Sequence, residues 1–357
     1  MLYLGLLSQD TPYVDKLIRY LGQKHGAELS ASGFSSRTSL DAYLSDHKLD
    51  VLLAERDLLG PDASSLAFPV GLLTDLQDAA SIDGLPAVGK YQRVEQIYKS
   101  VLDLCASVSL EGVTFSSGPV QELPVIAVLG AAGGVGATTL GVACAKSLSQ
   151  GGLRTLYLNL EAFSDFSDLL DGEGTATLSD VLYAIKSGSQ LLRLKLESTV
   201  RRDRSGVWFY MPFQETMDFC SLSGEEAGTL LQAILSSGLF DAVVADPGAQ
   251  PSPVLSAVLE VSRRVLAVTD GSGEGNRKLS RMLALYRRLD EARASRPLLP
   301  QFRLLYNRLG PESIRLEGDA GLPSLGSFPR LENASRSQVV QQLAAGEPFL
   351  HLMQDME

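Results

Sequence analysis

Short apolar runs alternate with amphipathic stretches along the chain. In the first part, the apolar runs predict strands at 2–7, 28–34, 51–54, 67–73 and 85–88. The amphipathic stretches between them predict helices at 13–23, 40–44 and 94–105. Because strands and helices alternate, we predict a parallel sheet that helices cover on both faces.

Beyond a polar stretch that contains glycine and serine, the same alternation resumes on a larger scale. Strands are predicted at 125–129, 155–160, 207–211, 242–245, 265–268 and 302–306. Helices are predicted between them, notably at 140–148, 225–235 and 277–289. We therefore predict an α/β protein with two doubly wound domains, one at 1–106 and one at 124–357, joined by a linker at 107–123.

The composition is that of a globular protein, with 45% hydrophobic and 20% charged residues among 357. The net charge of −11 argues against unaided binding to nucleic acid or to an anionic membrane, because phosphate surfaces repel a negative face. Three widely separated cysteines predict neither a disulfide framework nor a zinc site. The apolar start is too short for a signal peptide, and no apolar run approaches the roughly 20 residues of a membrane span. We expect a cytoplasmic protein without direct membrane insertion.

The first strand of the second domain leads into a glycine-rich turn at 130–139 and then into a helix. This order forms an anion site, because backbone N–H groups converge on a phosphate at the positive end of the helix dipole. The turn resembles the deviant Walker A motif of the MinD/ParA family, Lys-Gly-Gly-x-Gly-Lys-Thr-Thr. The matching residues are Ala132, Gly133, Gly134, Val135, Gly136, Ala137, Thr138 and Thr139. Both lysines of the motif are therefore alanine here, and a glycine turn without a ligand is the alternative interpretation.

Four later segments resemble MinD/ParA motifs and occur in the order of that family, and the last two contain Asn307 and Pro329, respectively. The first is the strand end at 157–161, where Asn159 and Glu161 stand at the two acidic positions of the family's second-strand motif. The second, 241–248, resembles Walker B followed by switch II. Each motif is weak alone, but their order and spacing together favour the family fold over the whole second part.

These motifs imply roles for several residues. Asp246 would reach Mg²⁺ through water, and Gly248 would sense the γ-phosphate. Asn307 and Arg308 fall at the strand end where the family reads adenine through the asparagine side chain. Pro329 falls in the loop that lies beside the base in that family. The implied cofactors are therefore ATP and Mg²⁺.

The resemblance further implies a homodimer with ATP between its subunits and Thr138 on the metal. Ala132 and Ala137 replace the lysines that act in trans and in cis, respectively. Losing one charge-assisted hydrogen bond to phosphate costs roughly 1.5–3 kcal/mol, or one to two decades in affinity. Hydrolysis is more sensitive, since a trans-acting arginine alone contributes about 10³–10⁵ in rate. We therefore expect that nucleotide binding survives and that turnover is weak or absent.

Any remaining activity would need a substitute cation. The sequence offers Arg308, Lys278 or Arg264 for this role. In that case Glu161 would position the attacking water and Asp246 the magnesium.

The first domain resembles a response-regulator receiver whose chemistry has been lost. Glu55 stands at the end of the third strand, where the phosphoacceptor is expected, and Thr74 and Lys90 end the fourth and fifth strands. Asp10 follows the first strand, but residues 8–9 are Ser-Gln where magnesium-binding acids are expected. We interpret the domain as a pseudo-receiver. Either it is a docking domain with a satisfied Glu–Lys ion pair, or that pair permanently mimics the phosphorylated state.

A degenerate receiver followed by a MinD/ParA-like domain resembles the TadZ/CpaE proteins of tight-adherence (type IVc) pilus assembly. This resemblance implies a dimerising, ATP-binding scaffold that organises pilus and secretion-assembly proteins, at a cell pole or at the membrane through those partners. Two alternatives stay open. One is a nucleotide-free interaction module, and the other is an active ATPase with a substitute cation.

Overall fold

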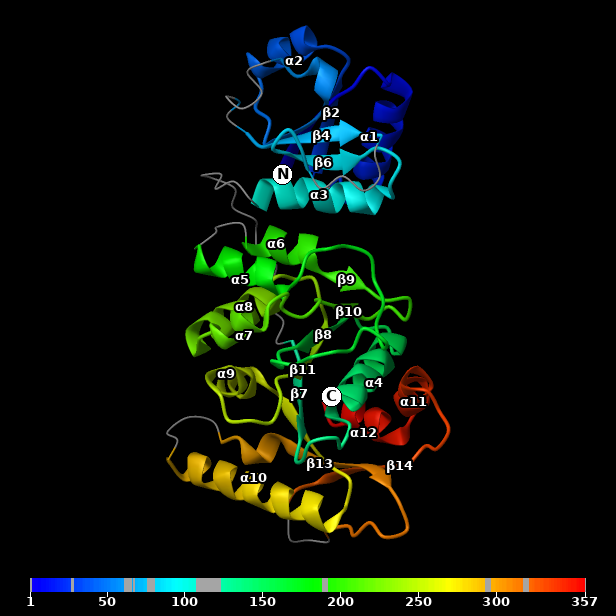
Figure 1. The fold of residues 1–357 in the computed structure, drawn as a ribbon, viewed down its shortest axis with the longest axis vertical. Helices are drawn as coiled ribbons and strands as arrows, with labels where there is room; N and C mark the ends of the chain where they lie inside the picture. The colour runs from blue at the N-terminus through cyan, green and yellow to red at the C-terminus, as the bar shows by residue number, and fades with distance from the viewer. Residues whose placement is uncertain are drawn as a thin grey trace. The chain divides into compact units, whose positions relative to one another are not determined.

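The chain forms two compact units in a computed structural model (Figure 1). The residues described are 2–26, 29–60, 66, 68–75, 81–106, 123–187, 192–292, 297–316 and 321–356. The first unit comprises Met1–Ser116 and Lys186–Thr199, and the second comprises Ser117–Ile185 and Val200–Glu357. The chain therefore passes between the units three times. The linker predicted at 107–123 lies outside the described residues apart from Leu123.

The first unit contains a mainly parallel sheet. Its strands are β1 (Leu2–Leu7), β2 (Leu29–Phe34), β3 (Val51–Glu55), β4 (Val70–Thr74), β5 (Ser81–Ile82) and β6 (Leu85–Gly89). They lie in the order β2-β1-β3-β4-β6-β5, and only the short β5 is antiparallel to its neighbour. Without β5, the order is that of flavodoxin-like sheets, in which the carboxyl ends of the central strands form the functional edge.

Four helices and a single 3₁₀ turn complete the described part of this unit. They are α1 (Thr11–His25), α2 (Arg37–Leu44), the turn η1 (Arg56–Leu58), α3 (Val94–Ala106) and α6 (Leu192–Thr199). Helix α6 comes from far along the sequence, yet it packs against α3 and its Leu194 belongs to the core of this unit. An ion pair of 2.5 Å between Lys195 and Asp103 joins the two helices. The sequence did not predict this addition to the first unit.

The second unit contains a larger sheet, again mainly parallel. Its strands are β7 (Val125–Gly130), β8 (Thr155–Asn159), β9 (Arg201–Arg202), β10 (Trp208–Phe209), β11 (Ala242–Asp246), β12 (Arg264–Thr269), β13 (Phe302–Leu309) and β14 (Ser324–Pro329). Their order is β14-β13-β12-β7-β11-β8-β10-β9, and only β9 pairs antiparallel. The central strands are buried on both faces, which explains why they read as continuous apolar runs. The predicted α/β fold class is confirmed.

Helices cover both faces of the second sheet. They are α4 (Ala137–Gln150), α5 (Leu178–Lys186), α7 (Thr216–Cys220), α8 (Gly224–Ser236), α9 (Pro253–Val261), α10 (Gly273–Ala292), α11 (Arg336–Ala344) and α12 (Glu347–Gln354), with a 3₁₀ turn η3 (Leu299–Gln301). Helices α4, α11 and α12 lie on one side and α8, α9 and α10 on the other (Figure 1). Helix α4 is almost wholly buried. Its small residues allow this close approach, since a Cβ on Gly141 would already lie 3.1 Å from the Tyr157 ring.

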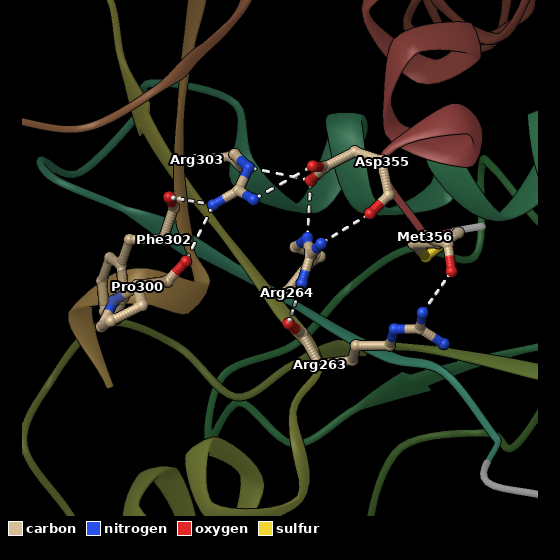
Figure 2. A network of polar contacts seen from close by, with 7 residues as sticks. All are labelled: Arg263, Arg264, Pro300, Phe302, Arg303, Asp355 and Met356. Atoms are coloured by element: carbon tan, nitrogen blue, oxygen red, sulfur yellow. Dashed lines mark hydrogen bonds and ion pairs between the residues drawn. The ribbon is translucent and has the colours of Figure 1, made fainter. Parts of the chain in front are cut away.

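The end of α12 is tied to the amino ends of β12 and β13 by an ion cluster (Figure 2). The Asp355 carboxylate accepts from Arg264 Nε at 2.5 Å and from Arg303 Nε at 2.8 Å. Arg264 also donates to the Asp355 carbonyl at 2.5 Å, and Arg263 donates to the carbonyl of Met356. Within the described residues, the helices are all too short or too polar to cross a membrane.

Candidate functional site

The glycine-rich turn connects the carboxyl end of β7 to the amino end of α4. Gly134 and Gly136 have φ angles of +76° and +88°, a left-handed region that other residues enter only with strain. Gly136 is also the N-cap residue of α4, and a Cβ there would lie 2.5 Å from the Asn307 amide nitrogen. This turn therefore needs glycine at position 136 for two reasons, its backbone conformation and the neighbouring side chain.

The turn borders a hollow of about 460 Å³ that brings together most of the predicted site. Its lining includes the turn from Ala132 to Thr139, then Glu161, Asp246, Gly248 and Arg308. A second hollow of about 430 Å³ is lined by Asn307 and Pro329, and it shares Thr139, Arg308 and Arg336 with the first. The predicted nucleotide-binding residues thus fall into two hollows with common walls, one at the turn and one beside the predicted base loop.

Asp246 is the buried carboxylate of this site and ends β11, with 2% of its surface exposed. Its carboxylate accepts from the Tyr157 hydroxyl at 3.1 Å and from the Asn159 amide at 3.2 Å, and also from the Thr138 hydroxyl. Burial raises the pKa of Asp246 to about 6, with a further increase from the charge of Glu161, against the lowering effect of these donors. All three of these side-chain donors are neutral, so they leave the charge of the carboxylate uncompensated.

The Thr138 hydroxyl and the Asp246 carboxylate are oxygen ligands that fit a bound Mg²⁺ ion. A hydroxyl and a carboxylate in contact are hard ligands, and Mg²⁺ on a nucleotide needs only one or two protein oxygens because water and phosphate supply the rest. Such an ion would supply the positive charge that the neutral donors to Asp246 do not carry. Asn159 stands at the first acidic position of the family motif but is a neutral amide, and its Oδ1 accepts from the Glu161 backbone N–H at 3.0 Å. Here, position 159 therefore holds the strand end in place and adds no charge.

Asn307 and Arg308 donate to the turn itself. Asn307 Nδ2 lies 2.7 Å from the Val135 carbonyl, and Arg308 Nη1 lies 2.6 Å from the Gly134 carbonyl. Asn307 is buried, with 3% of its surface exposed, so this hydrogen bond is shielded from water. The bond to the Val135 carbonyl uses one of the two N–H groups of Asn307 Nδ2, so the adenine-reading role implied for Asn307 would be served by its second N–H or by its Oδ1.

The three candidate substitute cations lie in different places. Arg308 contacts the turn, as described. Lys278 pairs with Glu274 at 2.6 Å on the exposed surface of α10, and Arg264 belongs to the cluster of Figure 2 at the opposite end of the sheet. Arg336, the first residue of α11, also lines the hollow at the turn. Arg336 could not be predicted from the sequence, because no motif surrounds it and its position depends on how α11 packs.

In the first unit, Glu55 and Lys90 form an ion pair at the carboxyl ends of β3 and β6. Glu55 also accepts from the Ser8 hydroxyl at 2.8 Å and from the Gln9 backbone N–H at 3.0 Å. The Asp10 side chain instead caps α1, where it accepts a hydrogen bond from the Tyr13 N–H. Thr74 ends β4, and its carbonyl accepts from the Lys90 N–H at 2.8 Å. Both interpretations of the pseudo-receiver expect this Glu–Lys pair.

The ion pair should make the stability of the first unit depend on pH in a defined way. Burial alone would raise the pKa of Glu55, but hydrogen bonds from Lys90, Gln9 and Ser8 outweigh burial and lower it. Its contribution is therefore complete above the ordinary pKa of 4.5 and disappears as pH falls through the lower folded value. The pKa of Lys90 is raised, against the effect of burial, by the hydrogen bond and charge of Glu55, so its contribution is lost only above pH 10.5.

We expect Glu55→Gln to destabilise the first unit by about 1–2 kcal/mol between pH 5 and 9, and by progressively less as pH falls below 4.5 and through the lower folded pKa of Glu55. Hydrogen exchange of the β3 amides in the full chain would measure this at each pH. The control is Asp41→Asn, which removes an exposed partner of Arg37 and should change stability by less than about 0.5 kcal/mol. A Glu55→Gln effect that persists undiminished at pH 3 would contradict the electrostatic explanation.

No protein-family model matches the sequence, and a comparison with curated proteins gave no match. Several solved structures share the fold, however. A ParA family ATPase from Chlorobium tepidum is 19% identical over 66% of this chain and 98% of its own, with a TM-score of 0.52. Apo McdA from Cyanothece is 16% identical over 66% of this chain and all of its own, with a TM-score of 0.51. The ATP complex of a McdA variant from Cyanothece gives 17% identity over 66% and 97%, with a TM-score of 0.50. Together with the turn between β7 and α4, these likenesses show that the chain contains a MinD/ParA-like P-loop NTPase fold.

Proposed function

We propose that this protein is an ATP-binding scaffold that dimerises across the nucleotide and hydrolyses it weakly or not at all. One observation carries the proposal. The turn has glycine at the positive-φ positions 134 and 136 and leads into the amino end of α4, and Thr138 and Asp246 line the same hollow, while Ala132 and Ala137 occupy the positions of the family's two lysines. The site therefore keeps residues that can bind a nucleotide and lacks the two positive charges that the family uses for hydrolysis.

Binding can survive because most of its sources are independent of the lysines. The backbone N–H groups of the turn and the amino end of α4 attract phosphate without side-chain charge. Thr138 and Asp246 would hold Mg²⁺, which neutralises part of the phosphate charge when it is bound. The second hollow, beside Pro329, has room for the base. The missing charge mainly affects the transition state, so the proposal predicts retained affinity and lost turnover.

The pilus-assembly role is part of the same proposal. It is supported by a flavodoxin-like strand order in the first unit, by the Glu55–Lys90 ion pair at the carboxyl ends of its strands, and by the resemblance of the sequence to TadZ/CpaE proteins. In this proposal the nucleotide controls dimerisation, and the pseudo-receivers present docking surfaces to pilus and secretion-assembly proteins.

Titration of the full chain with a non-hydrolysable ATP analogue and Mg²⁺ should show saturable binding, accompanied by dimer formation in light scattering. Gly134→Asp should weaken that binding roughly 100-fold or more. A Cβ at Gly134 meets nothing within 4 Å, so the added carboxylate acts by charge on top of the backbone strain that its φ of +76° imposes on any side chain. Two like charges about 5 Å apart repel by about 3 kcal/mol at an effective dielectric constant of 20.

The matched control for this titration is Gly238→Asp. Gly238 also has a positive φ, of +71°, and open space at its Cβ, but it precedes the opposite, amino end of β11. This variant should bind like the wild type. Absence of binding by the wild type at millimolar analogue would refute the proposal, and phosphate release well above background would refute its hydrolysis part.

A nucleotide-free interaction module is the second candidate. It is favoured by the hydrogen bonds of Asn307 and Arg308 to the Val135 and Gly134 carbonyls, because the turn is held in place by the protein's own side chains. That candidate predicts that Gly134→Asp leaves dimerisation unchanged, whereas the scaffold proposal predicts loss of the nucleotide-dependent dimer.

A further inference from the structure

Two arginines from distant parts of the chain line the hollow at the glycine turn. Arg308 lies near the end of β13, and Arg336 is the first residue of α11. Both also line the second hollow, so they stand on the boundary between the two. The hollow at the turn is also lined by the carboxylates of Glu161 and Asp246, so the two arginines are its cationic side chains opposite two acidic ones.

Arg308 places its guanidinium directly over the turn. Its Nη1 donates to the Gly134 carbonyl at 2.6 Å. A Cβ on Gly136 would lie 3.7 Å from its Nε and 3.8 Å from its Nη2, so the guanidinium spans both positive-φ glycines. Its own φ is +55°, a left-handed conformation that costs a non-glycine residue roughly 1–2 kcal/mol. Such strained residues concentrate at functional sites, because selection tolerates the cost there.

Arg336 also occupies a position that opposes its charge. It is the first residue of α11, after the N-cap Ser335, where the helix dipole disfavours a cation. It pairs with Asp168 at 2.8 Å, and the two side chains are 39% and 51% exposed. Exposed pairs of this kind contribute little, so the guanidinium can leave Asp168 for a stronger anion at small cost.

We infer that Arg308 and Arg336, from the same subunit, supply the phosphate-binding charge that is missing at Ala132 and Ala137. The inference rests on the proposed nucleotide binding and names the residues that select its ligand. On binding, Arg308 exchanges the Gly134 carbonyl for terminal phosphate oxygens, and Arg336 exchanges Asp168 in the same way. A guanidinium can bind two phosphate oxygens at once, which an ammonium cannot match in geometry. The preferred ligand is therefore a nucleoside triphosphate, and a nucleoside monophosphate gains little from this charge.

The test compares Mg²⁺ with a non-hydrolysable ATP analogue, and AMP, as ligands of the full-length chain in calorimetric titrations. Arg308→Ala should weaken binding of the triphosphate roughly 10- to 100-fold, and Arg336→Ala should weaken it in the same direction, while AMP affinity changes less than about threefold. Lys278→Ala is the control, because it removes an exposed cation whose partner is Glu274 on α10. It should leave both affinities unchanged.

Two further variants separate a role in binding from a role in folding. Arg308→Gly removes the guanidinium and also the backbone strain, so it should weaken triphosphate binding without lowering the melting temperature. Ala137→Lys should restore most of the affinity lost in Arg308→Ala and should gain less in the wild-type background, since both charges act on the same phosphates.

The outcomes are distinguishable. If the wild type binds the analogue and both arginine variants bind within threefold of it, the inference is wrong and the proposed function stands. Equal losses for the triphosphate and AMP would also overturn it, because the arginines would then act on the base or on the turn itself. If the wild type binds no nucleotide, the proposed function fails and the inference fails with it.

Discussion

Replacing Gly136 by alanine should lower the free energy of unfolding of the second unit by about 2–5 kcal/mol and abolish nucleotide binding. Two costs add. Alanine at a φ of +88° is strained by roughly 1–2 kcal/mol. Its Cβ would also lie 2.5 Å from Asn307 Nδ2, which cannot simply swing away because it is buried and bonded to the Val135 carbonyl. Displacing it leaves buried polar groups without partners, at about 1–3 kcal/mol.

Urea denaturation followed by Trp208 fluorescence would measure this effect, since Trp208 is the single tryptophan of the chain and lies in the second unit. Gly134→Ala is the matched control. It introduces the same residue at a similar φ but meets nothing within 4 Å, so it should show the strain term alone. In the double variant Gly136→Ala/Asn307→Ala the collision is removed. The destabilisation of the double variant should therefore be smaller than the sum of the destabilisations of the two single variants. Equal destabilisation by Gly134→Ala and Gly136→Ala would contradict the role assigned to Asn307.

The strands and the glycine turn could be predicted from the sequence because both depend on local patterns. Strands buried on two faces are uninterrupted apolar runs, and β7, β11 and β12 appear within a residue or two of the predicted ranges. The less accurate predictions concern strands near the edge of the sheet. The strand expected at 207–211 is only Trp208–Phe209, since little of the sheet lies beyond it apart from the short antiparallel β9. The packing of α6 on α3 was not predicted, because nothing in residues 192–199 specifies which core their apolar side chains join.

The candidate site shows the same division between local and distant information. Thr138, Glu161, Asp246 and Arg308 follow or end parallel strands of one sheet, and the carboxyl ends of parallel strands meet at one edge. A motif in sequence therefore predicts a neighbourhood in space. It does not predict which side chain turns toward which atom, so the contacts of Asn307 with the turn and the presence of Arg336 required the structure.

Replacing Asp355 by alanine should destabilise the second unit by about 2–4 kcal/mol, although the residue is next to last in the described chain. The Arg264 and Arg303 side chains are only 17% and 12% exposed, and both donate to this one carboxylate (Figure 2). Without it, two partly buried cations would face each other with no counter-ion. Breaking a buried pair costs about 3–5 kcal/mol, and we expect less here because the Asp355 side chain is 31% exposed.

The melting temperature should fall by roughly 5–15 °C, given a shift of about 2–4 °C per kcal/mol for a unit of this size. Glu274→Ala is the control, because it breaks an exposed pair with Lys278 and should cost less than about 0.5 kcal/mol. Asp355→Asn should cost nearly as much as alanine, since it keeps the shape of the side chain and removes only its charge.

The pH dependence of the destabilisation by Asp355→Ala distinguishes a loss of charge from a loss of packing at the end of α12. Burial would raise the pKa of Asp355, but the hydrogen bonds and charges of Arg303 and Arg264 hold it below the ordinary 3.8. The stabilisation is therefore complete above pH 4 and is lost as pH falls through the lower folded value. The gap between wild type and Asp355→Ala should stay constant from pH 5 to 8 and narrow as pH falls below the ordinary pKa of 3.8 and through the lower folded value. A gap that stays unchanged while the Asp355 carboxyl is seen by NMR to become protonated would mean that the variant acts by loosening α12 and not by removing the charge.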